Sequence, residues 1–297
     1  MTRSMATLIG FLAVLLWSLL AVLTVATVPV PPFQLTALTF AVGAGVGLIW
    51  GAVTGSLGQL RQVPLRVYAA GTLGLFGYHA LYFSALRLAP PAEAGLIAYL
   101  WPLLIVLMSG LLPGEVLRRG HILGAVLGFA GAALIILGGR GAGQPGAMAG
   151  YGLALLCAVF WSSYSVLSRR MKTVPTVSVT VFCAATAVLS ALMHVGTEIT
   201  VWPSFAGWCA VVALGLGPVG AAFFVWDIGV KRGDIQLLGT ASYAAPVLST
   251  FVLIAAGQAV ASPSLIWATV LIVGGAALAA RASAEKGVSG TGGRSLL

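Results

Sequence analysis

Stretches of about 20 residues with almost no charge recur along the whole chain, and this pattern constrains the fold more than any other feature. Only 7% of the residues are Asp, Glu, Lys or Arg, whereas a typical soluble domain has roughly 25%. A chain with so few charges cannot cover a water-soluble globule. A helix of about 20 apolar residues spans the hydrocarbon core of a bilayer. The sequence therefore predicts an all-α integral membrane protein.

Ten apolar stretches, separated by short loops rich in Gly, Pro and charged residues, are expected to be transmembrane helices. They cover 5–26, 33–53, 65–87, 91–111, 120–138, 149–168, 174–195, 205–230, 236–256 and 263–281.

The positions of Lys and Arg predict the orientation of these helices. With the N-terminus in the cytoplasm, 13 of the 15 Lys and Arg residues fall on the cytoplasmic side, and only Arg87 and Arg140 fall outside. Positive residues gather in cytoplasmic loops, so a miscounted helix would scramble this alternation. Both termini are therefore predicted to be cytoplasmic. The net charge of +9 is spread over these loops and forms no basic patch with interleaved aromatics, which argues against a nucleic-acid partner.

The two halves of the chain match at a fixed offset of 144 residues. The matches are Trp17-Ser18 with Trp161-Ser162, Val30-Pro31 with Val174-Pro175, Gly71 with Gly215, Gly95 with Gly239, Tyr99-x-x-Pro102 with Tyr243-x-x-Pro246, and Gly131-Ala-Ala-Leu134 with Gly275-Ala-Ala-Leu278. A repeat of five helices ends on the opposite side of the membrane from its start, so the second copy is inverted. We expect a first repeat at 1–138, a linker loop at 139–148, a second, inverted repeat at 149–281 and a disordered cytoplasmic tail at 282–297.

Inverted repeats point to a function. They produce two interconvertible conformations, open to one side or the other, around a binding site at the middle of the membrane. This architecture predicts a small-molecule transporter rather than an enzyme or a scaffold.

The repeated Trp-Ser, the Pro113-Gly-Glu115 after the fourth helix and the Gly-rich fifth and tenth helices resemble the EamA-type drug/metabolite transporter superfamily. The runs 77–83 (GYHALYF) and 98–102 (AYLWP) are most similar to its bacterial aromatic amino acid exporter (YddG-like) branch. One departure is Gly257-Gln258, which stands where the first half has Gly-Glu.

The resemblance implies export of aromatic and other neutral amino acids from the cytoplasm across the bacterial inner membrane. We expect the protein to work as a monomer, and nothing in the sequence requires a cofactor. A broader metabolite or drug exporter of the same superfamily is the alternative.

Polar aromatic side chains at the middle of the membrane need hydrogen-bond partners from the protein or from cavity water. We expect them to line an aromatic cavity for the substrate. The candidates are Trp17, Tyr78, His79, Tyr82, Tyr99, Trp101, Trp161, Tyr164 and Tyr243. Tyr99 and Trp101 would point roughly 200° apart on a regular helix, so only one of them lines the cavity unless Pro102 distorts the turn.

His79 is the only ionisable side chain near the middle of a predicted span. It could contact substrate, make a structural hydrogen bond or relay a proton. Pro102 and Pro246 stand at matched positions within their spans, and each removes a backbone hydrogen bond. They are either moving hinges or static bends.

Other classes of function find little support. A serine enzyme would need a base beside its nucleophile, but Ser84 follows His79 by five residues and lies on another face of the helix. No Cys/His spacing suits a metal, no catalytic residue is expected, and no charged or carbonyl filter typical of a channel is present.

Overall fold

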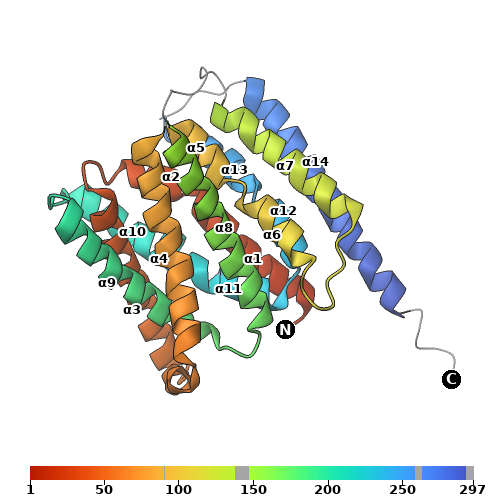
Figure 1. Cartoon of the computed structure of the whole chain (residues 1–297), viewed down its shortest axis with the longest axis horizontal. Coiled ribbons are helices and arrows are strands. Elements are labelled where there is room, and N and C mark those ends of the chain that lie inside the picture. The colour runs from red at the N-terminus through yellow and green to blue at the C-terminus, as the bar shows by residue number, and fades with distance from the viewer. Residues whose placement is uncertain (90, 138–146, 258–262, 292–297) are drawn as a thin grey trace.

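The computed structural model describes residues 1–89, 91–137, 147–257 and 263–291. Within these ranges the regular elements are all helices, and no β-strand occurs among them. Figure 1 shows the helices packed side by side in one bundle. Each predicted apolar stretch is helical over most of its length, because its residues satisfy their backbone groups internally and turn apolar side chains outward.

The bounds of the helices are α1 (Arg3–Ser18), α2 (Leu20–Val25), α3 (Pro32–Val53), η1 (Leu57–Gln62), α4 (Leu65–Leu88), α5 (Pro91–Ala98), α6 (Trp101–Ser109), α7 (Arg119–Leu137), α8 (Met148–Arg170), η2 (Thr176–Ser178), α9 (Val179–Thr197), α10 (Phe205–Leu216), η3 (Gly217–Ala221), α11 (Ala222–Arg232), α12 (Ile235–Ala241), α13 (Ala244–Ala255) and α14 (Pro263–Thr291).

Seven helical runs in the described part of the chain are long and apolar enough to cross a membrane. They are 3–25, 32–53, 148–170, 176–197, 205–232, 235–255 and 266–283. Helix α4 has 24 residues but carries Tyr78, His79 and Tyr82, which lower its hydropathy. Helices α5 and α6 are short, with 8 and 9 residues. The chain is thus a helical protein with several membrane-spanning segments.

Two runs are interrupted just before the prolines that were predicted to kink them. Helix α6 begins at Trp101 with Pro102 in its first turn, and α13 begins at Ala244 with Pro246 in its first turn. Proline suits the first turn of a helix, because the N–H it lacks would have no partner there. Each proline therefore starts a new helix after a short turn and does not bend a continuous one.

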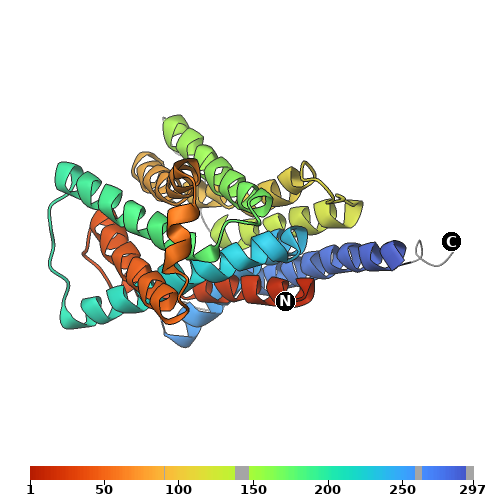
Figure 2. The same ribbon diagram turned by 90° about the horizontal axis from the view of Figure 1, so that it is seen from below.

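Helices from the two halves of the chain pair along their lengths. The most extensive pairs are α7 with α14, α3 with α9, α4 with α8, and α1 with α11. Helices α7 and α14 lie side by side at one edge of the bundle (Figures 1 and 2). They approach so closely that a Cβ added to Gly275, as in any other residue, would lie 2.5 Å from the carbonyl oxygen of Gly124. Small residues at such crossings permit backbone contact between helices.

Helix α14 continues to Thr291, ten residues beyond the predicted end of the last span at 281. The helix thereby enters the segment that the sequence predicted to be a disordered tail. The residues that follow Arg281 include Ala, Glu and Lys, which favour helix. Residues 138–146, which include most of the predicted linker loop at 139–148, and the last six residues, 292–297, lie outside the described residues.

Glu198, just after α9, joins α9 to the start of α3. Its carboxylate accepts the backbone N–H groups of Phe33 and Gln34, each at 3.0 Å. These groups have no partner within α3, and the positive end of the helix favours a negative charge there. We expect Glu198→Gln to lower the free energy of unfolding by about 1–3 kcal/mol. Thermal unfolding in detergent checks this, with the exposed Thr197→Ala as control; equal melting of the two variants would contradict it.

Candidate functional site

An aromatic group surrounds Trp17 in the middle of the bundle. The Trp17 ring lies 6.0 Å from Trp101 and 5.8 Å from Trp161, measured between ring centroids. It also lies 5.2 Å from Trp226 and 6.3 Å from Phe223. These rings come from α1, α6, α8 and α11, so residues distant in sequence meet at one place. The Trp17 indole N–H donates to the carbonyl of Pro218 at 3.0 Å, within the π-helical turn η3.

Helix α4 contributes a polar face to this group. Tyr78 and Tyr82, one turn apart, stack with their ring centroids 6.0 Å apart, and Tyr78 lies 5.6 Å from Trp161. His79 lies 4.9 Å from Phe40, and its Nδ1 is 2.7 Å from the carbonyl oxygen of Leu75. A carbonyl only accepts, so Nδ1 carries the proton of this bond. In the neutral ring Nε2 is then a hydrogen-bond acceptor.

The turn between α5 and α6 brings Tyr99 and Trp101 to the same side. On a regular helix they would point in nearly opposite directions, but their ring centroids are only 6.5 Å apart. The chain leaves the helix at Tyr99 and Leu100 and starts again at Trp101. A broken helix therefore places two residues on the site where a straight one would place one.

The predicted site residues differ in exposure. Five of them are half-buried, namely Trp17, Tyr78, His79, Tyr82 and Tyr99. Trp101, Trp161 and Tyr164 are buried, and the Tyr164 ring lies 5.4 Å from that of Trp161. The half-buried members all belong to the first half of the chain, so the accessible face of the group comes from that half.

Tyr243 borders the aromatic group, in a separate buried cluster against which Tyr99 also packs. It is fully buried, its ring centroid is 6.3 Å from that of Phe129, and its hydroxyl accepts the backbone N–H of Leu103 at 3.1 Å. That N–H belongs to the first turn of α6, where the helix itself supplies no acceptor.

Three aromatic residues of the group were missed from sequence: Phe40, Phe223 and Trp226. The repeat carried a signal for two of them, because Phe223 matches His79 and Trp226 matches Tyr82 at the offset of 144. Phe40 had no such signal, since the sequence cannot distinguish a site Phe in an apolar helix from a Phe that only packs in the core.

Charged side chains form a network at one end of the bundle. Glu115, in the loop after α6, pairs with Arg169 of α8 at 2.5 Å and with Arg3 of α1 at 3.3 Å. Arg3 also pairs with Asp234 at 3.0 Å. We call Arg3, Glu115, Arg169 and Asp234 the ion-pair network. Asp227 separately pairs with Lys231, four residues later in α11, at 2.8 Å.

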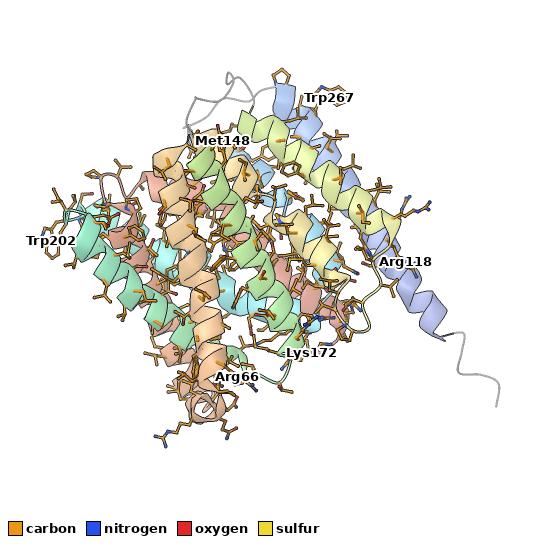
Figure 3. All side chains as sticks on the ribbon, in the orientation of Figure 1. Arg66, Arg118, Met148, Lys172, Trp202 and Trp267 are labelled. Atoms are coloured by element: carbon orange, nitrogen blue, oxygen red, sulfur yellow. The ribbon has the colours of Figure 1, made fainter. Side chains whose placement is uncertain are left out.

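Figure 3 shows Arg66 and Lys172 at the lower end of the bundle, toward which the N-terminus also lies, whereas Met148 and Trp267 lie at the upper end. In the described ranges, no group of three or more His, Cys, Asp or Glu side chains is placed to hold a metal ion.

A half-polar aromatic group enclosed by membrane helices from both halves defines a class, a polytopic membrane protein with a central site. Comparison with known proteins identifies the family within that class. The model of the EamA-like transporter family matches residues 4–137 and again residues 148–281. The chain belongs to this family and is an integral membrane transporter. The two matches begin 144 residues apart, which is the offset of the sequence repeat.

The chain is 59% identical over 283 residues to the "Aromatic amino acid exporter YddG" of Ancylobacter novellus, covering 94% of this chain and 98% of that protein. It is 27% identical to the protein of that name from Salmonella typhimurium, covering 84% and 88%. A solved crystal structure with 58% sequence identity matches with a TM-score of 0.90, covering 94% of this chain and 98% of the other.

Proposed function

We propose that the protein exports neutral amino acids, aromatic ones among them, from the cytoplasm by alternating access, with the substrate bound at the aromatic group around Trp17. The observation that carries this proposal is the meeting of Trp17 and Trp161, the matched tryptophans of the two halves, at 5.8 Å in the middle of the bundle. A substrate bound there touches both halves, so a movement of one half against the other changes the side to which it is exposed.

The pairing of helices supports two inverted halves, 1–138 and 149–281. Adding 144 carries α1 onto α8 and α4 onto α11, so the pair α1/α11 exchanges with the pair α8/α4. The pairs α3/α9 and α7/α14 exchange within themselves. Such an exchange is what a two-fold axis between the halves produces. Because each half has five spans, the axis lies in the membrane plane, giving ten spans in all.

Individual crossings obey the same exchange. A Cβ at Gly275 would lie 2.5 Å from the carbonyl oxygen of Gly124, and a Cβ at Gly131 would lie 2.8 Å from that of Ala268. At the offset of 144, Gly124 of the first half matches Ala268 of the second, and Gly275 of the second half matches Gly131 of the first. The two crossings are therefore symmetry-related copies of the same contact.

The lower end of Figure 3, with its basic residues, is the cytoplasmic end in this proposal. Both termini are then in the cytoplasm, and the protein resides in the inner membrane of a bacterium as a monomer. The ion-pair network belongs to this end, because Arg3 lies at the N-terminus.

The central site favours an uncharged or zwitterionic substrate. Its polar atoms are phenol, indole and imidazole groups, and no carboxylate is among the residues of the aromatic group that would attract a cationic drug. His79 Nε2 offers an acceptor for a donor on the substrate, such as its ammonium group, an indole N–H or a phenol O–H. Aromatic side chains prefer edge and offset contacts with the rings already present. A broader metabolite or drug exporter is the competing proposal.

Efflux from preloaded proteoliposomes tests the proposal. We expect the wild type to release radiolabelled phenylalanine and threonine and to retain a lipophilic cation. His79→Ala should slow amino acid efflux about tenfold or more, because a hydrogen bond to a charged group is worth about 1.5–3 kcal/mol. Ser84→Ala on the same helix is the control, since Ser84 bonds only its own helix, at Ala80 O. Release of the cation alone would contradict amino acid export and support the broader metabolite or drug exporter.

A further inference from the structure

Tyr99 and Tyr243 are matched residues that meet the same buried cluster but differ in burial and in hydrogen bonding. Each stands in the turn that interrupts its helix, three residues before Pro102 or Pro246. Tyr243 is fully buried with its hydroxyl on the N–H of Leu103, whereas Tyr99 is half-buried. The partner that matches Leu103 is Val247, and among the described residues no hydrogen bond joins Tyr99 to Val247.

The helices around the two tyrosines differ in the same way. Helix α12, which leads into Tyr243, packs on α6, and a Cβ at Gly239 would lie 3.2 Å from the carbonyl oxygen of Pro102. The matched pair is α5 with α13. A Cβ at Gly95, the match of Gly239, would meet only the Tyr82 hydroxyl, at 3.9 Å. Helix α5 packs instead on α4, α7 and α8, and α13 on α1, α2, α7 and α14.

The contact of α6 with α12 is at the basic end of the bundle, next to the ion-pair network, because α12 begins directly after Asp234. Helices α5 and α13 form the other end. One end of the site is thus held together by a tyrosine hydroxyl and a close glycine contact. The other end has the same residues without these contacts.

We propose that Tyr99 and Tyr243 are alternating latches, each holding one end of the carrier closed. Here a latch is the hydrogen bond from a first-turn backbone N–H to a tyrosine hydroxyl. In the opposite state Tyr99 accepts the N–H of Val247, α5 packs on α13 through Gly95, and Tyr243 is released. Tyr243 then joins the accessible face of the site, and Tyr99 leaves it. The inference rests on the proposed two-sided carrier of inverted halves.

The two latches differ in one neighbour. A Cβ at Gly128 would lie 2.5 Å from the Tyr243 ring, so this glycine makes room for that ring. The residue that matches Gly128 is Ile272. The Tyr99 latch therefore closes against a larger side chain, and the state with Tyr243 latched is favoured at rest.

Hydrogen–deuterium exchange of the purified wild type without substrate, and of four single variants, tests the latches. Tyr243→Phe removes the hydroxyl that accepts the Leu103 N–H. Gly239→Ala pushes α12 away from α6 and leaves the tyrosine unchanged. Both should raise deuterium uptake in 101–109 and 235–241 and lower it in 91–98 and 244–255, with about a fivefold change in the ratio of the two states. Tyr99→Phe and Gly95→Ala are the matched controls and should not raise uptake in 101–109 or 235–241.

Unchanged uptake in both Tyr243→Phe and Gly239→Ala would overturn the latches, as would the same direction of change in Tyr99→Phe and Tyr243→Phe. The readout is independent of the cargo. A wild type that releases no amino acid but shows the opposite responses keeps the latches and loses the proposed substrate. Amino acid efflux with unchanged uptake keeps the exporter and loses the latches.

Discussion

Glu115→Ala is expected to destabilise the protein by about 3 kcal/mol, at the lower end of the range for removing one partner of a buried ion pair. The side chains of Glu115 and Arg169 are 5% and 7% exposed, so water does not replace the lost carboxylate. The loss is limited because Arg169 also donates to the carbonyls of Val230 and Lys231, at 3.3 Å and 2.8 Å. The measurement is the midpoint of unfolding in detergent.

The ion-pair network supplies its own control. Arg3 pairs with Glu115 and Asp234, but its side chain is 40% exposed, and exposed ion pairs contribute about 0–1 kcal/mol. Arg3→Gln should therefore cost much less than Glu115→Ala and should lose its effect in high salt. Equal costs for the two variants would contradict the assignment of the main stabilising contact to the buried pair.

The sequence predicted the helices and most of the aromatic group because both depend on local composition or on the repeat. Apolar length predicted the positions of the helices, and the matched Trp-Ser and Tyr-x-x-Pro motifs pointed to Trp17, Trp161 and Tyr99. The prediction that Tyr99 and Trp101 could share the site only if the helix were distorted is answered by the turn between α5 and α6.

The partners of the charged residues could not be predicted from sequence. Glu115 and Arg169 are 54 residues apart, in the loop after α6 and at the end of α8, and only the packing of the two halves brings them together. The departure of the second half from Gly-Glu indicated that Glu115 has no matched glutamate, but it did not indicate a partner.

The difference between matched residues also lay beyond the sequence. Tyr99 and Tyr243 have the same local motif, so any argument from the motif assigns them the same role. A folded chain adopts one conformation at a time, and that conformation treats the two halves differently. Asymmetry between identical motifs therefore arises only in the folded chain.

Trp161→Ala is expected to lower the free energy of unfolding by about 3–5 kcal/mol. The Trp161 side chain is 3% exposed and is surrounded by other rings, including Phe223 at 5.7 Å and Trp101 at 6.2 Å. Removing the indole leaves these rings without contact on one side, and dispersion lost across such a void is not recovered from lipid. Unfolding in detergent, followed by the fluorescence of the remaining tryptophans, measures the loss.

Trp202→Ala is the matched control, because the Trp202 side chain is 79% exposed and its removal opens no internal space. A large loss of unfolding free energy for Trp161→Ala, beside a small one for Trp202→Ala, would mean that the second half forms a tightly packed wall of the site. Substrate would then contact mainly the half-buried residues of α1 and α4. Equal, small losses would mean that the group is loosely packed around Trp161. The substrate space would then extend between the halves, and Trp161 would contact substrate directly in the state described here.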